Sequence, residues 1–122
     1  MAKILIVDDD VDTRQLLKIR VESAGYETAF AADAVTAIQA AREQRPDLIL
    51  LDFGLPGGDA LVVMARLSTF PALAHIPVVV VSAREPTSTE QRSLLAGARA
   101  YVQKPIDNEQ LLGAIRSALH GE

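Results

Sequence analysis

The chain has 122 residues, of which 49% are hydrophobic and 23% charged, a mixture typical of one globular domain rather than a disordered or fibrous protein. The absence of cysteine excludes disulfides, thiolate nucleophiles and cysteine-ligated metal sites. The net charge of -4 argues against direct nucleic-acid binding, since phosphate contacts require clustered lysine and arginine. The sequence has neither an apolar run long enough to span a membrane nor a signal peptide, so we expect a cytoplasmic protein without membrane contact.

Apolar segments alternate with segments of helical period along the whole chain. In chain order, we predict a strand at residues 3–7, a first helix that carries Leu17 and Val21 and ends at Gly25, and a strand at 26–31. A helix at 34–41 with Asp33 as N-cap, a strand at 48–51, a helix at 59–67 and a strand at 78–81 follow. The last elements are a helix at 89–96, a strand at 100–103 and a helix that carries Leu112 and Leu119, with Asp107 as its cap.

This alternation predicts an α/β fold, (βα)5, with one parallel sheet between two layers of helices. The strands at 48–51 and 78–81 consist of Leu, Ile and Val, as expected for strands that are covered on both faces. The prolines fall between the predicted elements, so none of them marks a linker between domains. We therefore expect a single domain.

Polar and charged side chains follow four of the predicted strands. In chain order they are Asp8, Asp9, Asp10, Asp52, Ser82 and Lys104. Because ligands of open parallel sheets bind at the carboxyl ends of the strands, we expect these groups to converge at one edge. Clustered carboxylates ionise poorly without a cation, and their oxygens suit Mg²⁺, while Lys104 supplies a second positive charge.

The strand ends and their surroundings resemble the receiver domain of bacterial response regulators. The motifs are ILIVDDD at the first strand, PDLILLDFGLPGGD at the third, IPVVVVSA at the fourth and GARAYVQKPI at the fifth. The resemblance covers essentially the whole chain and implies a flavodoxin-like, doubly wound, five-stranded parallel sheet with strand order 2-1-3-4-5. It also implies a chemotaxis-regulator-like phosphoprotein of a two-component system. We expect one receiver domain over residues 1–122 without an output domain, either as a single-domain regulator that works by protein contact or as a receiver cut from a larger regulator or hybrid kinase.

The resemblance assigns the central role to Asp52, which would accept a phosphoryl group from a histidine kinase or a histidine phosphotransfer protein. It implies that Asp8, Asp9, Asp52 and the backbone carbonyl of Gly54 hold Mg²⁺, for which Mn²⁺ can substitute. The physics of phosphoryl transfer agrees with these roles, since its catalysis is mainly positioning and stabilisation of negative charge by cations.

Further residues complete the implied switch. Lys104 would pair with Asp52 and then with a phosphoryl oxygen, and Pro105, after a cis peptide bond, would hold Lys104 in place. Ser82 would donate its hydroxyl to the phosphoryl group, and Tyr101 would then turn inward and change the surface formed by the fourth helix, fifth strand and fifth helix. We expect an unknown downstream protein at that surface and a resting monomer, and the same surface permits a phosphorylation-dependent dimer.

Side chains at two further positions modulate the phosphorylated state in this family, and here those positions carry Gly54 and Arg84. Gly54 offers no side chain, whereas Arg84 either contacts the phosphoryl group or blocks water. The leading interpretation is a switch that catalyses only its own phosphorylation and dephosphorylation. Two alternatives stay open: an aspartyl-phosphate hydrolase with Asp8 as nucleophile and Asp10 as acid/base, and a degenerate receiver that acts only as an interaction module.

Overall fold

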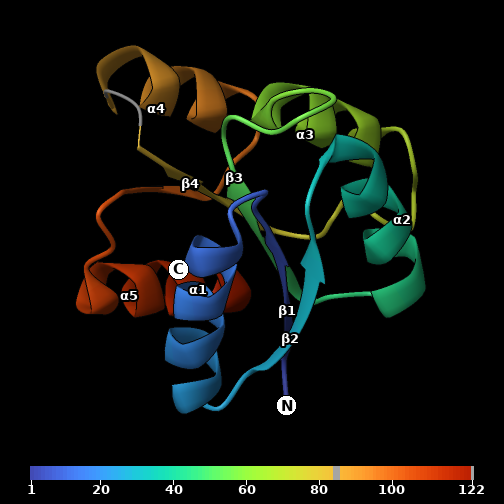
Figure 1. Ribbon diagram of the computed structural model, residues 1–122. Helices are drawn as coiled ribbons and strands as arrows, with labels where there is room; N and C mark the ends of the chain where they lie inside the picture. Colours follow the sequence, from blue (N-terminus) through green and yellow to red (C-terminus); the bar gives the residue numbers. More distant parts are fainter. Residues whose placement is uncertain (84–85, 122) are drawn as a thin grey trace.

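The computed structural model describes residues 1–83 and 86–121 (Figure 1). Five strands alternate with five helices in this part of the chain. The strands are β1 (Lys3–Val7), β2 (Glu27–Ala31), β3 (Leu48–Asp52), β4 (Val78–Ser82) and β5 (Ala100–Gln103). The helices are α1 (Val11–Ser23), α2 (Ala34–Gln44), α3 (Ala60–Ser68), α4 (Pro86–Leu95) and α5 (Asn108–His120). The order of elements confirms the predicted five strand–helix units.

The five strands form one parallel sheet with the order β2-β1-β3-β4-β5. This confirms the flavodoxin-like α/β fold. Chain order reverses next to β1, so the neighbouring carboxyl ends of β1 and β3 form the crevice where a parallel sheet places its ligands. Within the described residues no helix exceeds 13 residues, and none has the length and apolar character to cross a bilayer.

Several predicted boundaries differ from the structure by a few residues, and the differences at the starts of β2 and α4 have a clear cause. β2 begins at Glu27 rather than at residue 26, because the N–H of Tyr26 still donates to the carbonyl of Val21 in the turn that ends α1. α4 begins at Pro86, three residues before the predicted start at 89. Proline fits the first turn of a helix, where its missing N–H has no intrahelical partner. The apolar period alone could not reveal this polar first turn.

Side chains from the two faces of the sheet form two separate hydrophobic clusters. One cluster packs the sheet against α2 and α3, with Leu51, Phe53 and Met64 among its members. The other packs it against α1 and α5, with Leu50 and Ile115 among its members. Neighbouring residues of β3 thus belong to different clusters, because successive strand side chains point to opposite faces. Figure 1 shows α1 and α5 together on one side and α2 and α3 on the other.

Aspartates occupy the N-cap positions of four helices, but they do not all act as caps. The Asp33 side chain accepts a hydrogen bond from the N–H of Thr36, as predicted, and Asp59 accepts one of 3.1 Å from Val62. Asp107 lies at the N-cap of α5 as expected, yet its side chain makes no capping hydrogen bond. The sequence predicted which residue lies at the N-cap, but it did not predict whether the side-chain rotamer of that residue makes a capping hydrogen bond.

We expect Asp59→Ala to lower the free energy of unfolding by about 1 kcal/mol, because it leaves the N–H of Val62 in the first turn of α3 without its acceptor. Asp107→Ala serves as the matched control, since it removes an aspartate from an N-cap that lacks a side-chain hydrogen bond. Urea denaturation followed by circular dichroism measures both variants. Equal losses in the two variants would contradict a specific capping role of Asp59.

Candidate functional site at the carboxyl end of the sheet

Three of the predicted site residues meet where β1, β3 and β5 end. The Lys104 Nζ atom lies 3.0 Å from a carboxylate oxygen of Asp8 and 3.0 Å from one of Asp52. One ammonium group therefore bridges two carboxylates that are 96 and 52 residues away in sequence. The prediction paired Lys104 with Asp52, and the structure adds Asp8 as a second partner.

Burial differs among these three side chains. Asp8 is 2% exposed, Asp52 is 12% exposed and Lys104 is 21% exposed. Both Asp8 oxygens are engaged, because the second one accepts a hydrogen bond of 2.9 Å from the N–H of Asp10. Asp52 is thus the carboxylate of this pair that is more accessible from solvent.

Backbone hydrogen bonds hold the strand ends in place. The N–H of Lys104 donates to the carbonyl of Ser82 at 2.7 Å, and the N–H of Phe53 donates to the carbonyl of Val81 at 3.2 Å. These bonds tie the chain just beyond β5 to the end of β4, and the chain just beyond β3 to β4. The geometry of the charged groups therefore rests on the sheet rather than on mobile surface loops.

Burial shapes the electrostatics of Asp52. Desolvation raises the pKa of its carboxyl above 3.8, and the charges of Asp8 and Asp9 act in the same direction, while the hydrogen bond from Lys104 opposes them. For Lys104, desolvation lowers the pKa, but its bonds to Asp8 and Asp52 outweigh this and hold the pKa above 10.5. Lys104 is therefore cationic at neutral pH, and the site keeps an excess of carboxylates.

The donor set at this edge fits a divalent cation. Asp8, Asp9 and Asp52 each offer a carboxylate oxygen, and these three atoms lie within 4.8 Å of one another. Mg²⁺ prefers oxygen ligands and keeps several waters, so one exposed ligand and two more buried ones suit it. Among the described residues, the predicted metal ligands Asp8, Asp9 and Asp52 therefore do lie together, and Gly54 lies in the exposed loop directly beyond β3.

The remaining predicted residues have varied surroundings. Ser82 ends β4 and is 1% exposed, and Tyr101 is 9% exposed and packs in the cluster beneath α2 and α3. The peptide bond between Lys104 and Pro105 is cis, as the resemblance implied. Arg84 lies outside the described residues. The switch roles of Ser82 and Tyr101 stay predictions.

Asp10, the third aspartate of the run, caps α1 instead of facing the other carboxylates. Its carboxylate accepts hydrogen bonds from the N–H of Asp12 at 3.3 Å and from the hydroxyl of Thr13 at 2.6 Å. The hydrogen bond from Thr13 is the main reason that the pKa of Asp10 lies below 3.8. A carboxylate that is held ionised at a helix start is a poor general acid, which weakens the hydrolase alternative.

Two arginines near the site were missed by sequence analysis. The Arg14 guanidinium donates to the backbone carbonyl of Asp8 at 2.7 Å and so braces the loop after β1. The Arg92 guanidinium of α4 lies 5.6 Å from the ring centre of Phe53, directly after Asp52. A lone arginine on a helix is usually a solvated side chain, so no pattern in the sequence pointed to these contacts.

We expect Asp52→Asn to melt a few degrees higher than the wild type at neutral pH without divalent cations. Because the pKa of Asp52 is raised in the folded state, the protonated carboxyl stabilises the fold relative to the ionised carboxylate. This stabilising contribution is complete below about pH 3.8 and is lost as pH rises through the folded-state pKa. The difference should therefore disappear in acid. Thermal unfolding at neutral pH and at acid pH measures this difference in melting temperature, with Asp107→Asn as the control. A lower melting temperature for Asp52→Asn than for the wild type at neutral pH would contradict the prediction.

The comparison with known families agrees with the fold. The model described as the response regulator receiver domain matches residues 4–116. The chain therefore belongs to the receiver domain family of two-component response regulators.

Relatives and solved structures support this membership. The polar-differentiation response regulator DivK of Brucella anthropi is 37% identical over 116 residues, which cover 95% of this chain and 94% of DivK. The response regulator PleD of Caulobacter vibrioides is also 37% identical over 95% of this chain, but the match spans only 26% of PleD. The crystal structure of a CheY-like receiver domain protein from Methanospirillum hungatei has a TM-score of 0.89 at 28% identity and covers 99% of this chain and 95% of that one.

Proposed function

We propose that this chain is a phosphorylation-controlled signalling switch in which Asp52 accepts a phosphoryl group from a phosphohistidine of a kinase or phosphotransfer protein. The observation that carries the proposal is the single ammonium group, Lys104 Nζ, at 3.0 Å from both Asp52 and Asp8. A fixed cation beside a carboxylate nucleophile is what phosphoryl transfer requires. The 12% exposure of Asp52 leaves it within reach of a donor.

In the proposed reaction, a carboxylate oxygen of Asp52 attacks phosphorus and the bond from phosphorus to the donor's imidazole nitrogen breaks. The electron pair of that bond returns to the nitrogen. Lys104 is placed to hold one phosphoryl oxygen, and Ser82 donates its hydroxyl to another. When Mg²⁺ or Mn²⁺ is bound by Asp8, Asp9, Asp52 and the Gly54 carbonyl, it neutralises the remaining negative charge.

The geometry favours Asp52 over Asp8 as the nucleophile. Asp8 is 2% exposed and both of its oxygens are engaged, by Lys104 and by the N–H of Asp10. An attacking oxygen needs a path to the donor, which the burial of Asp8 denies and the 12% exposure of Asp52 allows. The aspartyl-phosphate hydrolase that would use Asp8 therefore has less support than the switch.

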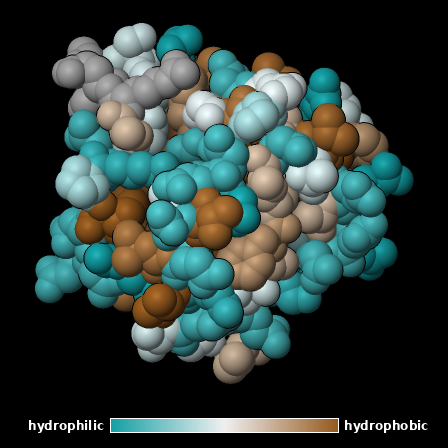
Figure 2. All heavy atoms as spheres, in the orientation of Figure 1, coloured by the Kyte–Doolittle hydropathy of each residue, from teal (hydrophilic) through white to brown (hydrophobic). Residues whose placement is uncertain are grey.

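A docking surface for the phosphodonor is available beside the site. α1 begins directly after the aspartate run and carries Val11, Leu16 and Ile19, which are 58%, 41% and 62% exposed. Hydrophobic residues are visible over the region of α1 in Figure 2. A donor that rests on this helix would have its histidine next to the strand ends, so we propose α1 as part of the donor's contact surface.

The output surface in this proposal is formed by α4, β5 and α5. Leu94 and Leu95 of α4 are 42% and 81% exposed, which suits a contact with a downstream protein or a second copy. Leu111 of α5 is fully buried, so it supports the core instead of this surface. Phosphorylation adds a charge of about -2 next to Ser82, and the resulting pull on the end of β4 would shift α4 and Tyr101.

Acetyl phosphate provides a direct test without knowledge of the kinase. We expect intact mass spectrometry to show a Mg²⁺-dependent gain of one phosphoryl group in the wild type and no gain in Asp52→Asn. Asp8→Asn should retain slow labelling, because it removes a metal ligand and leaves the acceptor. Labelling that survives in Asp52→Asn but not in Asp8→Asn would support the hydrolase. A wild type that is neither labelled nor binds Mg²⁺ would instead support the degenerate receiver that acts only as an interaction module.

A further inference from the structure

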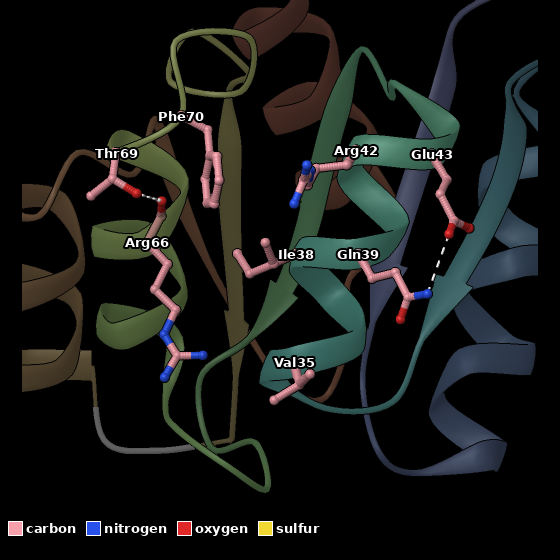
Figure 3. A pocket seen from close by; sticks show the side chains of 8 residues that line it. All are labelled: Val35, Ile38, Gln39, Arg42, Glu43, Arg66, Thr69 and Phe70. Carbon is pink, nitrogen blue, oxygen red and sulfur yellow. Dashed lines mark hydrogen bonds between the residues drawn. The ribbon is translucent and has the colours of Figure 1, made fainter.

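A groove begins between α2 and α3 and continues along the loops that follow these two helices, away from the Asp52 site. It consists of two adjoining hollows of about 710 Å³ each, and both hollows are lined by Arg42 and Phe70. Figure 3 shows the first hollow, where Val35 and Ile38 project from α2 toward α3 and Arg42 faces the Phe70 ring. We call these two hollows the α2–α3 groove. It shares no residue with the phosphorylation site.

The groove has an apolar floor that solvent can reach. Val35 is 62% exposed, and Ile38 and Phe70 are partly buried. Exposed apolar side chains that line a hollow, rather than being scattered singly, are typical of contact surfaces. The floor therefore offers binding energy to apolar side chains.

Three arginines place positive charge on the rim of the groove. Arg42, Arg45 and Arg66 line it, and within the described part of the chain none of the three has a carboxylate at salt-bridge distance. Of the two carboxylates that also line it, Glu43 accepts a hydrogen bond from Gln39, on the side of α2 that faces away from α3 in Figure 3. Asp47 accepts one from the backbone N–H of Lys3.

Arg42 is partly ordered before any ligand arrives. Its guanidinium lies 5.3 Å from the ring centre of Phe70, a cation–π contact between the two sides of the groove. This contact uses the charge of the guanidinium and not its N–H donors, which can still donate to a carboxylate. A chain with a net charge of -4 thus presents a surface whose arginines have no carboxylate at salt-bridge distance among the residues that the structure describes.

We propose that the α2–α3 groove binds an acidic, extended peptide segment of a partner protein, with apolar side chains on Ile38 and Phe70 and carboxylates on Arg42 and Arg66. The two hollows adjoin at Arg42 and Phe70, so an extended chain can occupy both while a compact ligand would occupy only one of them. α2 has 11 residues and is about 16 Å long, so an extended peptide of about six residues covers it. This proposal is independent of Asp52 phosphorylation.

Fluorescence anisotropy with a labelled peptide of about six alternating Glu and Leu residues tests the proposal. We expect saturable binding to the wild type and at least about tenfold weaker binding to Arg42→Glu/Arg66→Glu, because like charges then face each other. Arg116→Glu is the matched control, since Arg116 lies exposed on α5, on the other side of the sheet. It should bind the peptide as the wild type does.

Circular dichroism melts and acetyl phosphate labelling of Asp52 check that the double variant is folded and phosphorylatable, and the milder Arg42→Gln variant should give an intermediate affinity. No binding to the wild type, or an equal loss in Arg116→Glu, would overturn the proposal. Tighter binding of a peptide with Lys in place of Glu, or of a single-stranded oligonucleotide, would also overturn it.

Discussion

Lys104→Met is expected to slow phosphorylation of Asp52 by acetyl phosphate by about a hundredfold, the loss typical of removing one fixed donor of charge stabilisation. The Lys104 Nζ atom lies 3.0 Å from carboxylate oxygens of both Asp52 and Asp8. Without it, negative charge that develops on the phosphoryl oxygens meets two unneutralised carboxylates. The variant should therefore depend more strongly on the concentration of Mg²⁺.

The rate is measured by intact mass at a fixed Mg²⁺ concentration, with Lys18→Met as a control for the loss of one positive charge from the chain. Lys18 lies on α1 and, among the described residues, forms no salt bridge with Asp8 or Asp52. Lys104→Arg keeps the charge with a different donor geometry and should restore part of the rate. If Lys104→Met labels as fast as the wild type, then Lys104 only stabilises the folded domain.

Leu50→Ala is expected to lower the free energy of unfolding by about 3 kcal/mol, through lost apolar burial and the cavity that the smaller side chain leaves. Leu50 is 1% exposed in β3 and packs in the cluster between the sheet and α1 and α5. This loss is a large fraction of the 5–15 kcal/mol typical of a folded domain. The variant should unfold at a much lower urea concentration.

Urea denaturation measures this effect, and Leu95→Ala is its control. Leu95 is 81% exposed at the end of α4, so its truncation should change the free energy of unfolding by about 0.5 kcal/mol or less. Similar losses of unfolding free energy in both variants would show that burial of the side chain in the sheet does not determine how much a truncation destabilises the domain. An unchanged m-value would show that Leu50→Ala acts on stability and not on the denatured state.

Sequence reasoning succeeded where a local pattern carries the information. The strands were located because β3 and β4 are continuous Leu, Ile and Val, and the convergence of Asp8, Asp52 and Lys104 followed from the rule that parallel strands end at one edge. The capping role of Asp33 followed from its position before the segment of helical period that forms α2. Each of these inferences needed only a residue type and its place in a predicted element.

Sequence reasoning failed for contacts between side chains of two different elements, because such contacts depend on the rotamers of both side chains. The bond from Lys104 to Asp8, in addition to Asp52, depends on a single ammonium group that reaches two neighbouring strand ends at once. The stacking of Arg92 on Phe53 and of Arg42 on Phe70 depends on the distance between packed helices and loops. No period or motif in the sequence predicts which aromatic ring an arginine contacts, so these contacts could be found only in the structure.

The division of the core into two clusters has a consequence for how this chain can evolve. The residues that pack against α1 and α5 are different from those that pack against α2 and α3. Substitutions at distant positions without shared partners have nearly additive effects on stability. The proposed donor surface on α1 and the α2–α3 groove can therefore change separately in evolution. A lineage could then change the proposed partner on one side of the sheet while selection preserves the proposed partner on the other side.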